Sequence, residues 1–312
     1  MFRSQDSGID AVLRPAPPTT WDQFWESPAL FLARKIYNRC ASKLNITQIV
    51  SATTPNPTRT VTVVCIADTH NTRPRIPHGD ILLHAGDLTQ GGTQSEIQEA
   101  VDWLNAQPHR YKVAIAGNHE ERLDSTFAKS FPKPPRIDWG NVIYLENSST
   151  TLLCAGSREF KIYGSPWSPQ HGNGAFQHPR SNDVWHGNIP SDVDILLTHT
   201  PPRAHLDLGH GCDHLLRELW TMRKKPILHV FGHIHAAYGQ ETVLFDEFQL
   251  AYEDVIGGRA GVAGVLWLVY EYLKTFIFSR RCSAGGATLM ANASIVHGQK
   301  DELMREPLVI DL

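Results

Sequence analysis

The sequence has few cysteines, no long tract of basic residues and no apolar segment at its N-terminus. Its cysteines are odd in number, widely spaced and without a CxxC pair: Cys40, Cys65, Cys154, Cys212 and Cys282. We therefore expect small buried thiols in a reducing compartment and no disulfide framework. The opening stretch MFRSQDSGIDAVLRPAPP contains charges and prolines, so we expect no secretory signal and a cytoplasmic protein.

Charge of one sign is also scarce. The formal net charge is −3, and lysine and arginine are scattered along the chain. This balance gives no general attraction to nucleic-acid polymers, so no such partner is predicted. Apolar residues, in contrast, make up 41% of the 312 residues, which is enough to build a large α/β core.

Short apolar runs recur along the middle of the chain and predict strands at 61–66, 80–84, 111–115, 142–145, 160–163, 193–198 and 227–231. Helical patterns lie between some of them, at 94–106, 119–130 and 211–224. The strand-like runs lack alternation of apolar and polar residues, which is typical of strands buried on both faces. The pattern therefore predicts an α/β core whose sheet is covered by helices.

The chain divides into four predicted parts. Residues 1–60 are a lead-in with one or two amphipathic helices at 21–40, interrupted at Pro28. Residues 61–245 form the α/β core. Residues 246–283 are expected to be a helical insertion, and residues 284–312 return to strands that complete the core.

The segment 262–278, VAGVLWLVYEYLKTFIF, has only two charges, Glu271 and Lys274. It matches the shortest membrane span, about 17 residues, but charges near its middle disfavour a span. As a helix it has an apolar face formed by Val265, Leu268, Val269, Tyr272, Leu273 and Phe276. That face needs a cover: the N-terminal helix around Phe24–Tyr37, another subunit, or a peripheral membrane contact.

Polar side chains follow five of the predicted strands at the point where each strand ends. They are Asp68 and His70, Asp87, Asn118 with His119 and Glu120, His199, and His233 with His235. Ligands of open α/β sheets bind beyond the carboxyl ends of the strands, so we expect these side chains to meet. Gly86, Gly117 and Gly232 directly precede three of the clusters, and glycine permits sharp turns and close backbone approach.

Each cluster alone fits an ordinary structural role, such as a helix cap, a turn or a strand-end histidine. Five coincidences of residue type and position favour one shared metal site instead. The candidate ligands are Asp68, His70, Asp87, Asn118, His199, His233 and His235. Two cations about 4 Å apart, bridged by one carboxylate, use all seven. Nitrogen and oxygen ligands without thiolate suit Mn²⁺, which we favour, or Fe or Zn²⁺.

The motifs DTH, GD, GNHE, TH and GHIH occur in the order that characterises calcineurin-like metallophosphoesterases, and the resemblance covers about residues 61–245. HAGDLTQGG, THTPPRAHLD and FGHIHAAYG also resemble the metallophosphoesterase-domain-containing (MPPED) subgroup and its fungal relatives. The resemblance implies a four-layer αββα sandwich with the metals at the shared rim of two sheets. Extra N-terminal and C-terminal helices would flank it.

The resemblance also implies roles for the site residues. One metal would bind Asp68, His70, Asp87 and His235, and the other Asp87, Asn118, His199 and His233. His119 would assist at the leaving group without binding metal, oriented by Glu120 or by a nearby carboxylate such as Asp87. The chain departs from the subgroup at Ala67, Thr200 and Ala236, where we expect Ser, Gly and Glu, but no ligand is lost.

The implied activity is hydrolysis of a phosphate ester by attack of a metal-bridging hydroxide. We favour a phosphodiesterase acting on small phosphate esters or cyclic nucleotides, with Asp87 and His119 as catalytic residues. Asn118, His119, Arg203 and His205 are expected to contact the substrate. A serine/threonine protein phosphatase is the alternative within enzymes, and a metal-binding scaffold with little turnover is the alternative outside them.

Overall fold

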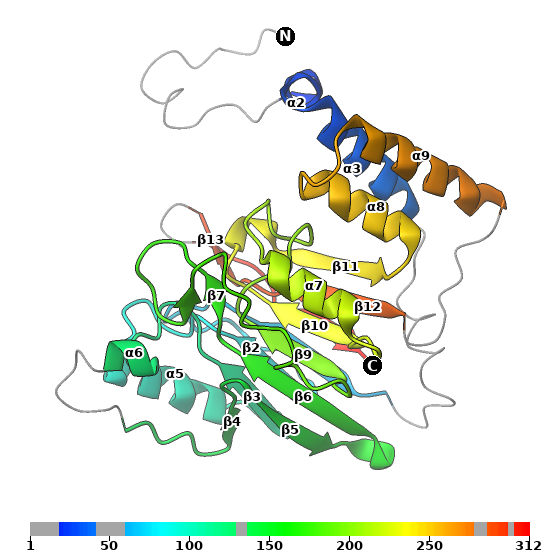
Figure 1. Cartoon of the computed structure of the whole chain (residues 1–312). Helices are drawn as coiled ribbons and strands as arrows, with labels where there is room; N and C mark the ends of the chain where they lie inside the picture. The colour runs from blue at the N-terminus through cyan, green and yellow to red at the C-terminus, as the bar shows by residue number, and fades with distance from the viewer. Residues whose placement is uncertain (1–18, 42–59, 129–135, 278–285, 299–302) are drawn as a thin grey trace, which may run out of the picture.

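Two stacked sheets form the centre of the molecule (Figure 1). The computed structural model describes residues 19–41, 60–128, 136–277, 286–298 and 303–312. The five-stranded sheet has the order β15-β1-β2-β3-β4. Its strands are β1 (Thr62–Ile66), β2 (Ile81–Ala85), β3 (Tyr111–Ile115), β4 (Val142–Tyr144) and β15 (Leu308–Asp311). Strands β1 to β4 are parallel, and β15 pairs antiparallel with β1.

The six-stranded sheet has the order β11-β12-β10-β9-β6-β5. Its strands are β5 (Ser148–Leu153), β6 (Glu159–Ser165), β9 (Ile195–Thr198), β10 (Leu228–Phe231), β11 (Gly239–Leu244) and β12 (Ala287–Asn292). The four central strands are parallel, whereas β5 and β11 are antiparallel edges. The prediction missed these two edges because their sequences, SSTTLL and GQETVL, are polar and only partly buried.

Three apolar cores separate four layers. Between the sheets lie residues such as Val63 and Leu197. The other face of the first sheet, including Val64, packs on helix α5 (Gln94–Asn105). The outer face of the second sheet packs on helix α7 (Asp213–Thr221), for example through Leu215. Neighbouring strand residues thus enter different cores, which explains the missing alternation and confirms the αββα sandwich.

The predicted helix at 119–130 is wrong over most of its length. Only α6 (Ser125–Ala128) is helical among the described residues of that range. The cause is local: the Glu120 side chain turns back to accept hydrogen bonds from Thr89 and from the Gly117 N–H. Asp124 then accepts from the Thr126 N–H at 2.7 Å, so the helix can begin only after it.

Four helices form a separate layer beside the sheets (Figure 1), here called the helical layer: α2 (Thr20–Glu26), α3 (Pro28–Ala41), α8 (Glu247–Ile256) and α9 (Val262–Ile277). Pro28 occupies the first position of α3, where its missing N–H has no cost. Tyr37 of α3 stacks on Tyr252 of α8, with ring centroids 3.8 Å apart. The N-terminal helix therefore covers the insertion, as expected, and α8 is a helix that the sequence analysis did not resolve.

Helix α9 turns a slightly different face inward than predicted. Val265 and Leu268 are buried as expected, but Leu273 is 55% exposed. Glu271 is buried instead, and the Lys274 ammonium donates to its carboxylate at 2.8 Å. This ion pair lets the charged residue take the inward position. Within the described part of the chain, no helix is long and apolar enough to cross a membrane.

Smaller elements complete the described chain: strand pairs β7 (Ser168–Pro169) with β8 (Gln177–His178) and β13 (Val296–His297) with β14 (Leu303–Met304), and 3-10 turns η1 (Ala155–Ser157) and η2 (His235–Ala237). Of the five cysteines, Cys65, Cys154 and Cys212 are free thiols in buried positions, as predicted. Of the predicted lead-in at 1–60, residues 1–18 and 42–59 lie outside the described residues, as do Cys282 and the side chain of Cys40.

Candidate metal centre

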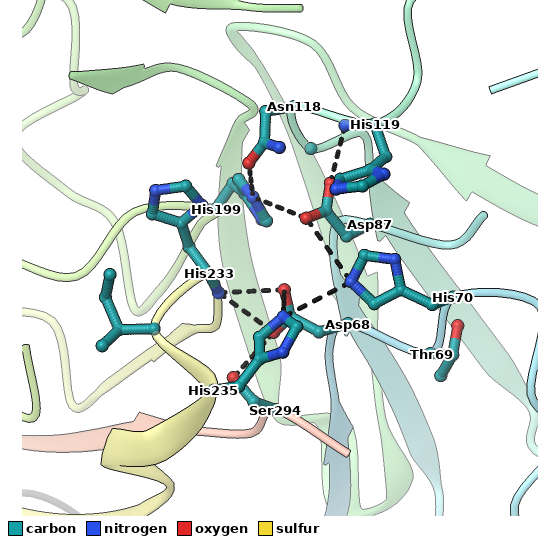
Figure 2. A network of polar contacts seen from close by, with 12 residues as sticks. Asp68, Thr69, His70, Asp87, Asn118, His119, His199, His233, His235 and Ser294 are labelled. Atoms are coloured by element: carbon teal, nitrogen blue, oxygen red, sulfur yellow. Dashed lines mark hydrogen bonds and ion pairs between the residues drawn. The ribbon is translucent and has the colours of Figure 1, made fainter. Parts of the chain in front are cut away.

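Five strand ends deliver polar side chains to one place, where the two sheets share a rim (Figure 2). Strands β1, β2 and β3 of the first sheet deliver Asp68 and His70, Asp87, and Asn118 with His119. Strands β9 and β10 of the second sheet deliver His199, and His233 with His235. The structure thus brings together every ligand predicted from the sequence, from both sheets.

The backbone at this rim is unusual. Asp68, His70, Asp87 and His233 have positive φ angles of 50°, 42°, 52° and 68°. Such angles cost non-glycine residues about 1–3 kcal/mol each and persist only where the surroundings hold them. Backbone bonds supply that support, for example from the Asp68 N–H to the Gly86 carbonyl at 2.9 Å. Strain concentrated on four ligand residues is typical of a functional site.

Two glycines are required by close packing against the carboxylates. A Cβ atom at Gly117 would collide with the Asp87 carboxylate, and one at Gly232 would collide with that of Asp68. Glycine is also required at position 86, because the φ angle of 94° there is unfavourable for residues with a side chain. The strand-end glycines therefore allow the ligand loops to approach one another.

The first group of ligand atoms belongs to Asp68, His70 and His235, which lie within 4.8 Å of one another. The Nε2 atoms of the two histidines are 3.3 Å apart, and Nε2 of His235 lies 3.5 Å from Oδ1 of Asp68. Nε2 of His70 also lies 3.8 Å from Oδ2 of Asp87. These separations fit ligands of one cation, because bonds of about 2.1 Å at right angles place two ligands about 3 Å apart.

The second group belongs to Asp87, His199 and His233. Nε2 of His199 lies 3.3 Å from Oδ2 of Asp87 and 2.9 Å from Oδ1 of Asn118. Asp87 therefore stands between the two groups, which is the bridging position predicted for it. A third combination of Asp87 with His70 and His119 also satisfies the same distance limit.

His199 shows most directly that the site fits a cation. Its Nδ1 must carry the hydrogen, because it donates to the Ala85 carbonyl at 3.0 Å. In the neutral ring, the Nε2 lone pair then faces two oxygens, from Asp87 and Asn118. Three electron pairs directed at one point repel each other unless a positive charge lies between them. A divalent cation satisfies all three, and the residues fit it.

The pKa values indicate a concentration of negative charge. Burial opposes ionisation of Asp68 and Asp87, but neighbouring histidines hold the pKa of both carboxyl groups below the usual range. Burial likewise disfavours the charged form of His199, yet Asp87 raises its pKa to about 9. For His233 burial dominates and lowers the pKa to about 3. The carboxylates around His199 thus favour a positive charge at the place where a cation would bind.

His119 lies at the rim with its backbone N–H donating to Oδ1 of Asp87 at 2.9 Å. Its ring Nδ1 donates to the Gln90 carbonyl at 2.8 Å, which leaves Nε2 available. Of the two carboxylates predicted to orient His119, Asp87 holds it through the backbone N–H bond, whereas Glu120 bonds other partners. Glu120 is fully buried and joins two ligand loops through Thr89 and Gly117, and burial raises its pKa to about 7.

The two residues expected to contact substrate from the 200–212 loop have other partners. Nη1 of Arg203 lies 3.7 Å from the Asp207 carboxylate. His205 is fully buried, and its two ring nitrogens face Glu241 and Glu253 at 3.0 Å each. Both bonds would have to open before His205 could touch a substrate. The contact predicted for Arg203 stays a prediction.

Sequence reasoning missed several supporting side chains. Oγ of Ser294 lies 2.7 Å from the Asp68 carboxylate. Nε2 of His84 lies 2.9 Å from the hydroxyl of Thr69, the residue between the candidate ligands Asp68 and His70 in the sequence. His229 bonds Thr198 just before the His199 turn. The only sequence signals were a strand-end serine and two histidines inside apolar strands, and none of these is distinctive alone.

The three departures from the subgroup do not touch the ligand set. The buried Ala67 pairs through its backbone with Ala293 and Ile295, each at 2.8 Å. Thr200 is buried, whereas Ala236 on η2 is exposed. The first two departures therefore lie inside the protein, and the third lies at its surface.

Comparison with protein-family models gives a match over residues 61–237 to the model described as calcineurin-like phosphoesterase. Human metallophosphoesterase domain-containing protein 1 is 40% identical over 214 residues, covering 59% of this chain and 64% of that protein. A UPF0046 protein of Caenorhabditis elegans is 33% identical over 266 residues, covering 74% and 65% of the respective chains.

A further relative is a protein of Emericella nidulans named probable rhamnogalacturonate lyase C. It is 43% identical over 307 residues, which cover 97% of this chain but 29% of that protein. The chain therefore spans less than a third of this relative and just under two thirds of the human and nematode ones. Nearly the whole chain, the helical layer included, is similar to the Emericella protein.

Proposed function

The chain belongs to the calcineurin-like phosphoesterase family, and we propose that it is a dinuclear phosphodiesterase acting on small phosphate esters or cyclic nucleotides. The observation that carries the proposal is the convergence of the seven candidate ligands. Six of them form two neighbouring groups within reach of Asp87, Asn118 contacts His199, and His119 lies beside them. The lyase activity in the name of the Emericella protein concerns that whole protein, and the site here suits phosphoester hydrolysis.

Two bound divalent cations would lower the pKa of a water molecule to near neutrality and polarise the phosphoryl oxygens. The protein's own contribution is position. Asp87 holds both ligand groups in register and also fixes the His119 backbone. Because Nδ1 of His119 is committed to the Gln90 carbonyl, Nε2 is the atom that delivers a proton to the leaving oxygen.

A diester suits the charges around the site. A phosphate diester carries one negative charge and a monoester up to two, so a monoesterase gains more from an extra fixed cation. Arg203, a cation placed by sequence near the ligand loop, is already balanced by Asp207. The resemblance to the MPPED subgroup favours the same substrate class, whereas a protein phosphatase would act on a phosphorylated side chain.

The test is hydrolysis of three substrates by chelator-treated protein to which Mn²⁺, Fe²⁺ or Zn²⁺ is added separately. We expect bis-p-nitrophenyl phosphate to be cleaved faster than p-nitrophenyl phosphate and a phosphoserine peptide, with Mn²⁺ the best activator. Faster cleavage of the peptide would support the protein phosphatase. Stoichiometric metal binding without turnover of any substrate would support the scaffold and overturn the proposal.

We also propose that the helical layer contacts a lipid surface from the cytoplasm. Eleven large apolar side chains are exposed among the described residues, and seven of them lie on α2, α3 and α9. They are Trp21, Trp25, Leu32, Val262, Leu266, Tyr270 and Leu273. Tryptophan and tyrosine favour the membrane interface, and Lys35 and Arg39 are exposed on the same side of α3 as Leu32.

Vesicle flotation tests this contact. We expect the full chain to float with phosphatidylcholine vesicles containing phosphatidylserine, and Leu266→Asp to reduce the bound fraction. Leu153→Asp is the matched control, because Leu153 is a similarly exposed leucine on edge strand β5. A chain that never floats contradicts the proposal. A dimer that Leu266→Asp dissociates would identify this face as a contact between two copies.

A further inference from the structure

The segment after β12 joins the two sheets at the metal centre. Strand β12 belongs to the six-stranded sheet, but the chain then crosses to β1 of the other sheet. There the Ala67 N–H donates to the Ala293 carbonyl, and the Ile295 N–H donates to the Ala67 carbonyl, each at 2.8 Å. This crossing places Ser294 directly beside Asp68, although the two are far apart in the sequence.

Ser294 is fully buried, and its Oγ lies 2.7 Å from Oδ2 of Asp68 (Figure 2). The same Oγ lies 2.7 Å from Oδ1 of Asn292, which is also fully buried. A hydroxyl group has one hydrogen, so it can donate to only one of these two oxygens. The orientation of Asn292 decides which.

The Asn292 amide can adopt only one orientation. Its Nδ2 donates to the carbonyls of Leu206 at 3.1 Å and Ile234 at 3.0 Å, and neither carbonyl could bond an oxygen. Oδ1 therefore faces Ser294 and accepts its backbone N–H at 3.2 Å. Since Oδ1 has this donor, the Ser294 hydrogen is free to go to the ionised Asp68 carboxylate, which is the stronger acceptor.

We propose that Ser294, held by Asn292, is the positioning residue for the metal ligand Asp68. The Asp68 carboxylate also accepts the His233 N–H, which lies 3.0 Å from both of its oxygens. The Ser294 bond adds a side-chain donor at Oδ2, on the side away from Oδ1, which lies 3.5 Å from Nε2 of His235 in the first ligand group. Asn292 bonds the carbonyl of Ile234, next to His235, and so ties the same support to a second ligand. The inference rests on the proposed metal-dependent function, since it concerns a ligand of that centre.

The test is Mn²⁺ binding to the full chain by equilibrium dialysis. Ser294→Ala is expected to lower the affinity for one of the two Mn²⁺ ions by about 10- to 100-fold, which is the range for residues that support metal ligands. The affinity for the other ion should not change. Ser294→Cys keeps a side chain of similar size with a weaker hydrogen-bond donor. Its Mn²⁺ affinity should therefore lie between those of the unchanged protein and Ser294→Ala, and it provides the test if the alanine variant does not fold. Ser294→Thr keeps the hydroxyl and should restore tighter binding.

Thr288→Val is the matched control. Thr288 lies on β12, the strand that leads to Ser294, is fully buried and donates its hydroxyl hydrogen to the Pro226 carbonyl at 2.7 Å. The Thr288→Val variant should bind both Mn²⁺ ions with normal affinity. Without metal, Thr288→Val and Ser294→Ala should have similar melting temperatures. The inference is overturned if Ser294→Ala binds two ions as tightly as the unchanged protein, or if Thr288→Val loses affinity equally.

The outcome for the unchanged protein separates the two proposals. If it binds two Mn²⁺ ions but hydrolyses no phosphate ester, the proposed function fails and the role of Ser294 is still decided by the variants. If it binds no metal, both proposals fail together. If it binds two ions and hydrolyses the diester while Ser294→Ala binds metal normally, only the role of Ser294 is wrong.

Discussion

The metal rim and the helical layer are built on opposite principles. At the rim, four of the candidate ligands (Asp68, His70, Asp87 and His199) are buried and the others are partly buried. Four of the seven lie on strained turns that backbone bonds support. In the helical layer, aromatic and aliphatic side chains such as Tyr37 and Tyr252 provide the contacts, and large apolar residues remain exposed. The rim is organised for fixed geometry, whereas the layer is organised for packing and surface contact.

This difference predicts that a change in one region affects metal and catalysis, and a change in the other affects stability or association. The largest effect is expected for Asp87→Asn, because this carboxylate lies within reach of both ligand groups. Both metals should loosen, and activity should fall by more than the roughly 100-fold typical of supporting residues. Metal analysis after dialysis and initial rates check this. Two retained ions with near-normal turnover would refute the bridging role.

His119→Ala should produce the next largest effect. The proton donor to the leaving group is removed but no predicted ligand is, so kcat should fall by roughly 10²–10⁴ while metal content stays normal. The loss should grow as the leaving group of the ester becomes more basic. His186→Ala, an exposed histidine beside Glu218, serves as the control. A His119 variant that loses metal would instead make this residue a ligand, as one of the three distance groups allows.

The contact between the two regions should depend on pH. Burial disfavours a charged His205, but Glu241 and Glu253 raise its pKa to about 10, above the unfolded value of 6.5. The stability from this charge is therefore fully present below about pH 6.5 and is lost as the pH rises to about 10. Urea unfolding should show a fall of up to about 1.4 kcal/mol per pH unit across that window. His205→Gln should flatten the slope, and an unchanged slope would contradict the assignment.

Tyr37→Ala should have the smallest effect and one confined to the helical layer. Removing this buried ring from its stack on Tyr252 should lower the free energy of unfolding by about 3 kcal/mol. Affinity for Mn²⁺ and kcat should not change, because no ligand contacts α3 among the described bonds. Thermal melting and metal titration measure the two quantities. A loss of metal would show that the rim and the helical layer are energetically coupled.

The convergence of the candidate ligands could be predicted because each of them closely follows an apolar strand, which marks its position locally. The residues that support the ligands could not. Ser294 reaches Asp68 through a chain crossing between two sheets, and a serine at the end of a strand more often serves only to form a turn. His205 stood beside the ligand His199 in sequence, but its partners come from β11 and α8, which local patterns did not reveal.

In the helical layer, too, the sequence predicted some features and missed others. Pro28 and the apolar spacing predicted one or two N-terminal helices and offered their packing on α9 as one of three possible covers, and the structure has two helices with α3 packed on α9. The inward face of α9 was misplaced because a helical wheel ranks residues by hydrophobicity. Lys274 neutralises Glu271, so the acidic residue turns inward and Leu273 turns outward. An ion pair between two neighbours is a property of the folded helix and not of the hydrophobic pattern.

The antiparallel ladder of β11 and β12 has a consequence for how this chain can vary. The ladder continues to Leu244 opposite Ala287, and the Phe245 N–H bonds the Gly286 carbonyl at 2.9 Å. The insertion at 245–286 therefore leaves and re-enters the sheet at adjacent points, in place of a hairpin turn. Loop-closure entropy changes by only about 0.6 kcal/mol for each doubling of such a loop. Segments of very different length can therefore be exchanged here while the ladder keeps its register, so the end of the β11–β12 ladder is a suitable place to graft a new surface module onto this chain.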